Sequence, residues 1–316
     1  MNFSVTILGC NSAIPTATRY PTAQIVNVQE NYYLVDCGEG TQIQLRRNKI
    51  KFQRIDAIFI SHLHGDHFFG LIGLVTTMQL LGRTRPLQIF GPSELEAILN
   101  IQLDKSRYGL HFELKFEALD FATSKVIYED DKVEVKTILL SHSIPCCGFR
   151  FQEKERPRKL NKFALDKFEV PMECYGKLKR GEDFVNAEGE IIQNSVLTAD
   201  PIPARTYAYC SDTSYNEGII PDIQGVDLLY HEATFLHDMK ERAVQTCHST
   251  ALEAGMIAAK AAVKRLVIGH YSARYGDLDP LVAEARTAFP ETVAGVEGRT
   301  YSVPMVEVTP STSSPS

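Results

Sequence analysis

Four residues with metal-binding side chains follow one another closely in the first quarter of the chain: His62, His64, Asp66 and His67, in the order H-x-H-x-D-H. They come directly after Ile58–Ile60, an apolar segment with the composition of a buried strand. Crowding four polar side chains onto one turn costs desolvation unless something pairs with them. Imidazole nitrogens and carboxylate oxygens suit Zn²⁺ and similar divalent ions. The spacing therefore predicts a metal site, in preference to a surface or helix-capping histidine cluster.

Three further residues of ligand type follow other apolar segments, each with the pattern of a strand. His142 follows Val133–Leu140, Asp212 follows Thr206–Cys210, and His270 follows Leu266–Gly269. Taken singly, a histidine at a strand end is as often a structural residue as a ligand. If all four strands end at one edge, however, seven ligands meet there, which is too many for a single tetrahedral zinc ion.

Seven ligands are enough for two metal ions. We expect one ion to be held by His62, His64 and His142, the other by Asp66, His67 and His270, with Asp212 between them. Two metals about 3.5–4 Å apart can activate a shared water and stabilise both oxygens of an in-line phosphoryl displacement. Such a pair of metals would suit the hydrolysis of a phosphodiester.

Strand and helix patterns along the chain would position these residues. The β-rich apolar segments are Val5–Leu8, Tyr32–Val35, Ile55–Ile60, Leu87–Phe90, Val133–Leu140, Thr206–Tyr209, Asp227–Tyr230 and Leu266–Ile268. Helical patterns cover Leu71–Leu81, Ser93–Leu103, Ser249–Ala262 and Leu281–Ala288, with Pro92-Ser93 and Asp279-Pro280 as helix starts. Because the first half is dominated by strands and the helices come in groups, we expect an α/β fold with layers of sheet and helix.

One segment interrupts this pattern with a concentration of positive charge. Residues 150–180 contain ten basic and five acidic residues, a local balance of +5 in a chain of net charge −6. We interpret residues 150–182 as a protruding, flexible insertion, with a merely solvated loop as the alternative. The last residues, 309–316, are only Ser, Thr and Pro, which predicts a disordered tail.

The composition excludes a chain that is disordered throughout, a collagen and a disulfide-rich miniprotein. With 316 residues, 44% hydrophobic and 23% charged, the chain has the values of a soluble globular protein with a sizeable core. No run of about 18 apolar residues occurs, so no membrane span is expected. The N-terminal residues lack a basic region and resemble a first strand, not a signal peptide. The seven cysteines, without a C-x-x-C pair, indicate reduced thiols in a cytoplasmic protein.

The order of these motifs resembles the metallo-β-lactamase superfamily, and within it the ribonuclease Z family in its short form. The resemblance covers residues 1–308 and implies an αββα sandwich as a single catalytic domain. Six stretches carry the closer match: Leu8–Thr16, Tyr33–Thr41, Ser211–Thr213, His231–Thr234 (HEAT), His248–Thr250 (HST) and His270–Tyr275. Any one of them is weak, but six in the right order are specific.

The resemblance also implies roles for individual residues. Two Zn²⁺ per chain are expected, with Mn²⁺ or Fe²⁺ as possible substitutes. Asp66 is then both a ligand and the proton acceptor for the attacking water, although a ligand role alone is the simpler alternative. His248, paired with Glu232, would protonate the leaving 3′ oxygen, whereas His248 or Ser249 as a plain helix cap is the competing interpretation. Asp36 either orients a ligating imidazole or belongs to an ordinary turn.

The family cuts tRNA precursors on the 3′ side of the acceptor stem, which leaves a 3′-hydroxyl on the tRNA and a 5′-phosphate on the trailer. Its arm grips the tRNA, and Tyr175–Gly181 matches a turn of that arm. We therefore expect substrate contacts from Lys177, Lys179, Arg180, Arg274 and Tyr275, with a structural salt bridge as the alternative for Arg274. The family also implies a homodimer in the cytoplasm, without a membrane partner.

Two other classes of function remain open from the sequence: another hydrolase of the same fold and a non-catalytic RNA-binding protein. A thioesterase or lactonase of the same fold would share the H-x-H-x-D-H stretch but has no use for a basic arm, and a small-molecule phosphodiesterase would need neither the arm nor tRNA. A non-catalytic RNA-binding protein with a decayed metal site is the alternative from another class, and metal content distinguishes it. His231 is expected to support the site without ligating, and His111 and His237 to be ordinary surface residues.

Overall fold

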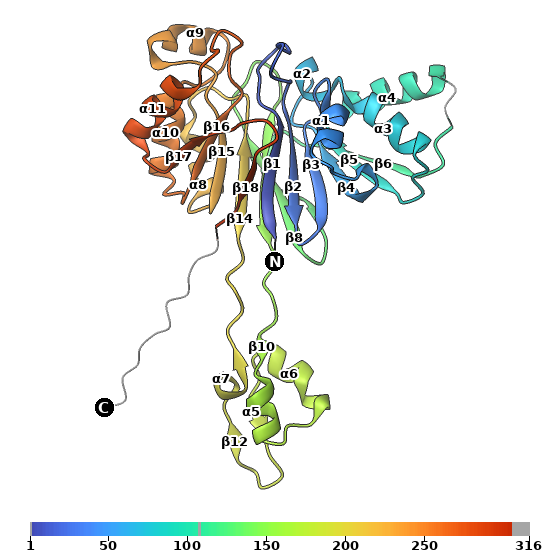
Figure 1. The fold of residues 1–316 in the computed structure, drawn as a ribbon, viewed down its shortest axis with the longest axis vertical. Coiled ribbons are helices and arrows are strands. Elements are labelled where there is room, and N and C mark those ends of the chain that lie inside the picture. Colours follow the sequence, from blue (N-terminus) through green and yellow to red (C-terminus); the bar gives the residue numbers. More distant parts are fainter. Residues whose placement is uncertain (1, 107–108, 305–316) are drawn as a thin grey trace. The chain divides into compact units, whose positions relative to one another are not determined.

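The computed structural model describes residues 2–106 and 109–304. The described residues divide into two compact units, one formed by residues 2–106, 109–152 and 205–304 and the other by residues 153–204 (Figure 1). The expected tail at 309–316 lies outside the described residues. Within the described part, no helix is long and apolar enough to cross a bilayer.

The first unit is built on two seven-stranded sheets. The first sheet has the order β18-β1-β2-β3-β4-β5-β6. Its strands β1 to β3 pair antiparallel, and β3 to β6 pair parallel. The strands are β1 Phe3–Gly9, β2 Ala23–Val28, β3 Asn31–Val35, β4 Ile55–Phe59, β5 Leu87–Gly91, β6 Leu114–Ala118 and β18 Thr300–Ser302.

The second sheet has the order β17-β16-β15-β14-β9-β8-β7. Strands β14 to β17 run parallel, whereas β9 pairs antiparallel with β14. The strands are β7 Val126–Glu129, β8 Val133–Leu139, β9 Cys147–Glu153, β14 Thr206–Cys210, β15 Leu228–Glu232, β16 Leu266–Gly269 and β17 Thr292–Ala294.

Helices cover the outer face of each sheet, and the sheets pack against each other (Figure 1). Successive residues of β4 show this: Phe59 packs in the core between the sheets, and Ile58 packs against the helices of the first sheet. Strands buried on both faces read as continuous apolar runs. The helices are α1 Thr41–Arg47, α2 Gly65–Phe68, α3 Leu71–Leu80, α4 Ser93–Ser106, α8 Ile220–Ile223, α9 Lys240–Gln245, α10 Ala251–Lys260 and α11 Asp279–Ala288.

This layering confirms the predicted αββα sandwich, and every predicted strand and helix of this unit is present. One boundary differs in an informative way. The expected helix Ser249–Ala262 begins at Ala251, and its cap is Thr250, whose hydroxyl accepts from the backbone N–H of Glu253. Glu253 in turn accepts from the backbone N–H of Thr250, a capping box. Neither His248 nor Ser249 is the cap, so the helix-cap alternative for His248 does not hold.

The second unit has its own small core. Buried apolar side chains from its helices and strands gather there: Ala164, Leu165, Val170, Leu178, Phe184, Ile192 and Leu197. Its elements are β10 Lys159–Leu160, α5 Lys162–Lys167, α6 Tyr175–Lys179, β11 Phe184–Val185, β12 Ile191–Ile192, α7 Asn194–Leu197 and β13 Thr198–Ala199.

The bounds and charge of this unit correct the expectation of a basic arm at 150–182. Arg150 lies in β9 of the second sheet, opposite Ala208 of β14. The compact unit runs from Glu153 to Ala204 and contains nine basic and ten acidic residues. Its net charge is therefore −1, because the acidic residues gather after residue 180. Any role in binding RNA must rest on how its charges are distributed, not on their sum.

Candidate metal centre and catalytic pair

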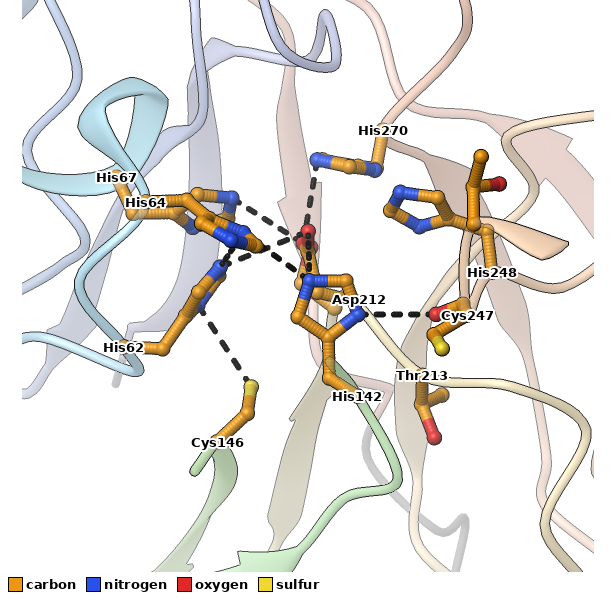
Figure 2. A network of polar contacts seen from close by, with 12 residues as sticks. His62, His64, His67, His142, Cys146, Asp212, Thr213, Cys247, His248 and His270 are labelled. Carbon is orange, nitrogen blue, oxygen red and sulfur yellow. Dashed lines mark hydrogen bonds and ion pairs between the residues drawn. The ribbon is translucent and has the colours of Figure 1, made fainter. Parts of the chain in front are cut away.

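The ends of four strands bring all seven expected ligands together. The turn after β4 carries His62, His64, Asp66 and His67, and His142 follows β8. Asp212 follows β14 and His270 follows β16. Figure 2 shows the histidine rings gathered around Asp212. Among the described residues, three sets of ligand-type atoms lie close enough to hold an ion. The first contains His62, His64, His142 and Asp212, the second Asp66, His67 and His270, and a third, which overlaps both, Asp212, His248 and His270.

The first set converges on His64. Its Nδ1 lies 3.1 Å from Nε2 of His62 and 3.1 Å from Nε2 of His142. Oδ2 of Asp212 lies 3.7 Å from both of those Nε2 atoms. Three imidazole nitrogens and one carboxylate oxygen therefore face a common point.

The second set converges on the other oxygen of Asp212. Oδ1 lies 3.1 Å from Nε2 of His67 and 3.1 Å from Nε2 of His270. Oδ2 of Asp66 lies 3.5 Å from His67 Nε2 and 3.6 Å from His270 Nε2. Asp212 thus turns one oxygen to each set, which is the geometry of a bridging carboxylate.

The donor atoms fit a pair of divalent ions. Two ligands at about 2.0–2.1 Å from a tetrahedral zinc ion are about 3.3 Å apart, which is close to the spacings found here. The buried Nε2 atoms of His67 and His270 make no hydrogen bond to any described residue. Buried polar atoms are rarely left in this state unless something binds them. The site residues therefore suit two metal ions.

Outward hydrogen bonds orient four of these imidazoles. Nδ1 of His62 lies 2.9 Å from Ser61 Oγ, and Nδ1 of His142 donates to the carbonyl oxygen of Cys247 at 2.9 Å. Nδ1 of His270 lies 3.1 Å from Oγ1 of Thr234. With the proton on Nδ1, each ring presents an unprotonated Nε2 to the centre, as metal binding requires.

Asp36 orients the fourth imidazole. It accepts from Nδ1 of His67 at 2.7 Å, from Ser61 Oγ at 3.0 Å and from Tyr209 OH at 2.6 Å. Asp36 is fully buried and adopts a left-handed backbone conformation (φ 54°). Such strain persists where the surroundings hold it in place. Of the two interpretations of Asp36, the structure favours the one in which it orients an imidazole.

The carboxylates at the centre stay ionised. Burial raises the pKa of Asp66, but the neighbouring His67 and His270 side chains, 3.5 and 3.6 Å away, hold that pKa far below its usual range. Burial likewise raises the pKa of Asp212, and the neighbouring histidines lower it well below normal. Asp66 also accepts a hydrogen bond from the backbone N–H of Ala13 at 2.8 Å. Its Oδ2 is therefore a fixed acceptor at the mouth of the site.

A buried acid–histidine pair lies beside the metal ligands. Nδ1 of His248 donates to Oε1 of Glu232 at 2.8 Å. Glu232 is fully buried and also accepts from the backbone N–H groups of Thr213 (2.7 Å) and Ser249 (3.0 Å). Burial lowers the pKa of His248, but the carboxylate of Glu232 outweighs it and raises that pKa to about 9. His248 is therefore suited to hold a proton at neutral pH.

His248, five of the seven ligand-type residues and several apolar residues line one cavity. It has a volume of about 530 Å³ and is lined by Ala13, Pro15, Pro21, Glu39, His64, Gly65, Asp66, Phe69, His142, Ser143, Asp212, Thr246, His248 and His270. Gly38 passes close to this region, since a Cβ there would lie 2.4 Å from the carbonyl oxygen of Asp66. Glycine at position 38 thus allows the two backbone segments to approach each other closely.

Similar proteins point to one family. Ribonuclease Z of Parabacteroides distasonis is 50% identical to this chain over 302 residues, which is 96% of this chain and 99% of the relative. Ribonuclease Z of Bacteroides thetaiotaomicron is 48% identical over 295 residues, 93% of each chain. The chain belongs to the ribonuclease Z family. As a member, it is a metal-dependent endoribonuclease.

Solved structures agree with this assignment. The crystal structure of human tRNase Z, short form, matches with a TM-score of 0.68 and 28% identity, and covers 95% of this chain and 99% of that one. The metallo-β-lactamase fold protein YhfI of Bacillus subtilis matches with a TM-score of 0.67 at 22% identity, over 96% of this chain, and supports the fold alone. The family model of the anti-Pycsar protein Apyc1 matches residues 3–154.

Three further residues singled out from the sequence, Arg274, Tyr275 and His231, contact residues of the first unit. Arg274 is exposed, stacks over the ring of Phe235 at 5.3 Å and forms no salt bridge with a described residue. The hydroxyl of Tyr275 accepts from the backbone N–H of Leu236 at 3.0 Å. His231 is buried beside Glu232, and its Nδ1 donates to the carbonyl oxygen of Glu232 at 2.8 Å.

The predicted arm residues lie in the unit of residues 153–204. Lys177, Lys179 and Arg180 are exposed on or next to α6, and Arg180 pairs with Glu182 at 3.0 Å. His111 is exposed, as expected. His237 is not an ordinary surface residue: it is half-buried, with Nδ1 3.0 Å from Oγ1 of Thr250.

Three contacts at the site have little or no sequence signal. The N–H of Ala13 and the carbonyl oxygen of Cys247 act through the backbone, which any residue type carries. Cys247 has a left-handed backbone (φ 55°) that turns its carbonyl oxygen toward His142. The hydroxyl of Thr234 contacts both Glu232 (2.6 Å) and His270 (3.1 Å). For Ala13 and Thr234, the resemblance of Leu8–Thr16 and of the HEAT stretch was the only available signal.

Proposed function

We propose that this chain removes the 3′ trailer from precursor tRNA and leaves a 3′-hydroxyl on the tRNA and a 5′-phosphate on the trailer. The observation that carries the proposal is the position of Asp212, with one oxygen facing each set of ligands. Family membership supplies the class of substrate, since the human relative is named a tRNase Z.

Two Zn²⁺ ions would be held by His62, His64 and His142 on one side, by Asp66, His67 and His270 on the other, and by Asp212 between them. When bound, they would activate a water and stabilise negative charge on the phosphodiester. The imidazole-rich donor set also suits Mn²⁺ and Fe²⁺, so metal supply contributes to the choice.

Asp66 would accept the proton of the attacking water. Its Oδ2 lines the cavity and is held by the N–H of Ala13. A carboxylate whose pKa is held far below its usual range stays ionised at neutral pH and is available to orient the water.

His248 would donate a proton to the leaving 3′ oxygen. Its Nδ1 is committed to Glu232, and the ring lines the cavity, so Nε2 is the atom left to face the substrate. The carboxylate of Glu232 stabilises the charged imidazolium in a fixed orientation. Acid catalysis of this kind typically contributes about 10²- to 10⁴-fold in rate.

Basic and aromatic side chains would bind the RNA. Lys177, Lys179 and Arg180 are exposed and available for phosphate contacts, and Arg274 and Tyr275 would hold the acceptor end. The resemblance to the family supports a homodimer in the cytoplasm, in which the arm of one copy serves the site of the other. Light scattering of the purified protein measures whether it is a dimer.

The experiment is a cleavage assay on a 3′-extended precursor tRNA with Zn²⁺ or Mn²⁺. Asp66→Ala and a chelated sample serve as controls. We expect a single cut next to the discriminator base, absent from both controls, with a 3′-hydroxyl on the tRNA. Absence of cleavage, with small diesters such as bis-p-nitrophenyl phosphate still hydrolysed, would instead indicate a small-molecule phosphodiesterase.

A further inference from the structure

An exposed aromatic ring lines the same cavity as the metal ligands. Phe69 is 65% exposed, whereas the core residues Phe59 and Phe149 are fully buried. A phenylalanine in this state contributes little burial to the stability of the fold. Because it shares a cavity with Asp66 and His248, its ring is available to a substrate.

The turn that carries the predicted metal ligands Asp66 and His67 holds the Phe69 ring in place. Phe69 directly follows α2, which contains Asp66 and His67, and its backbone N–H donates to the carbonyl oxygen of Gly65 at 2.9 Å. The ring lies against Gly65, where a Cβ would be only 2.1 Å from it. Phe68 packs edge-on against it, with ring centroids 5.0 Å apart. The turn that presents the ligands therefore also positions the ring.

The chemistry of the cavity indicates what would cover the ring. Ligand-type residues and His248, which suit a phosphodiester, line the cavity together with the apolar residues Pro15, Pro21 and Phe69. In a polynucleotide, a flat apolar base lies within one nucleotide of every phosphate. Bases stack on exposed aromatic side chains whatever their sequence, at about 1–3 kcal/mol per base.

We propose that Phe69 is a stacking platform for the nucleobase next to the scissile phosphate. The proposal rests on the function proposed above and adds a substrate-positioning residue to it. The stacked base would hold the phosphate against the ligands and His248, and a substrate without a base at that position would lose this anchor. Stacking also tolerates any base, which suits an enzyme that acts on many tRNAs.

The test combines Phe69→Ala and Phe69→Trp with precursor tRNAs that carry an abasic residue on either the 5′ or the 3′ side of the scissile phosphate. We expect Phe69→Ala to lower kcat/KM by about five- to a hundredfold, as the stacking range implies. The kcat/KM of Phe69→Trp should stay within a few-fold of that of the parent. The abasic substitution at the stacked position should lower kcat/KM of the parent by a similar factor and should not lower kcat/KM of Phe69→Ala any further.

Binding is read separately from cleavage. With chelator present to prevent cutting, 2-aminopurine placed at the stacked position should be quenched by the parent and by Phe69→Trp but not by Phe69→Ala. Leu80→Ala is the matched control, since Leu80 is 70% exposed on α3 and does not line the cavity. Metal content is measured for every variant.

The outcomes separate this proposal from the function itself. If the parent protein fails to cut precursor tRNA, the proposed function is wrong. If the parent cuts and Phe69→Ala cuts equally well, the function stands and the stacking platform is overturned. A loss in Phe69→Ala that is equally large on every abasic substrate, or that accompanies loss of metal, would assign the ring a structural role and also overturn it.

Discussion

Nδ1 of His248 donates to a carboxylate oxygen of Glu232 at 2.8 Å, and Glu232 is completely buried. Its other oxygen accepts from the hydroxyl of Thr234 and the N–H of Ser249. Since Thr234 also contacts Nδ1 of His270, one hydrogen-bonded chain connects His248, the proposed proton donor, to the predicted metal ligand His270. His248 and His270 are thus held in fixed positions relative to each other.

His248→Ala should retain fold and metal but lose most turnover, by about 10²- to 10⁴-fold, because the proton donor to the leaving oxygen is gone. Cleavage of precursor tRNA is measured at saturating substrate, with metal content beside it. His111→Ala is the control, because His111 is exposed and outside the cavity. Parent-like turnover in metal-loaded His248→Ala would remove His248 from the mechanism.

Asp36→Asn should weaken zinc binding by about 10- to 100-fold, because His67 loses the carboxylate that fixes its ring. Affinity is measured by competition with a chromophoric chelator. Asp227→Asn is the matched control. Asp227 is also buried and accepts from the backbone N–H of Thr206, but it directly precedes the first residue of β15, whereas Glu232 is the last residue of that strand. Equal affinity in parent and Asp36→Asn would make Asp36 a turn residue only.

Replacing Lys177, Lys179 and Arg180 together by Ala should weaken precursor tRNA binding and leave hydrolysis of bis-p-nitrophenyl phosphate unchanged. Each lost phosphate contact should reduce the slope of log affinity against log salt by about 0.7–0.9. Replacing Glu182, Glu188 and Glu190 by Gln changes charge in the same unit and serves as the control. A loss on both substrates would mean that these residues support the structure.

Stability should depend on pH through Glu297. Burial raises the pKa of Glu297 to about 7 from 4.5, although hydrogen bonds from Tyr20 and Cys10 oppose this. Between about pH 4.5 and 7 the folded protein therefore binds more protons at this residue than the unfolded chain, so its contribution to stability falls as pH rises. Urea unfolding at pH 5 and 7.5 should show a smaller decrease in Glu297→Gln than in the parent. An identical pH dependence would refute this assignment.

The convergence of the seven ligand-type residues is predictable from the sequence because each of them follows an apolar strand, and strand ends of a layered fold meet at an edge. His142, Asp212 and His270 are far apart along the chain, yet each comes within three residues of its strand. The contacts of Ala13 and Cys247 are not predictable from residue type, because they use backbone groups in left-handed conformations, which any residue carries.

The unit of residues 153–204 was harder to predict, for a different reason. A charge count that stops at residue 180 finds an excess of basic residues, but the chain continues through Glu182, Asp183, Glu188, Glu190 and Asp200 before the unit closes. Its strands have only two residues each, so no periodic pattern marks them. Arg150, counted with the arm, belongs to β9 because it alternates with the buried Phe149 and Phe151.

The central claim is that two metal ions, bridged by Asp212, are needed to cut precursor tRNA. The most direct measurement is a titration of metal-free protein with Zn²⁺, in which bound zinc and cleavage rate are followed together. The account predicts two ions per chain, no cleavage without them, and failure of Asp212→Ala to bind both ions tightly. Full cleavage in the presence of chelator, or full activity of Asp212→Ala, would contradict it.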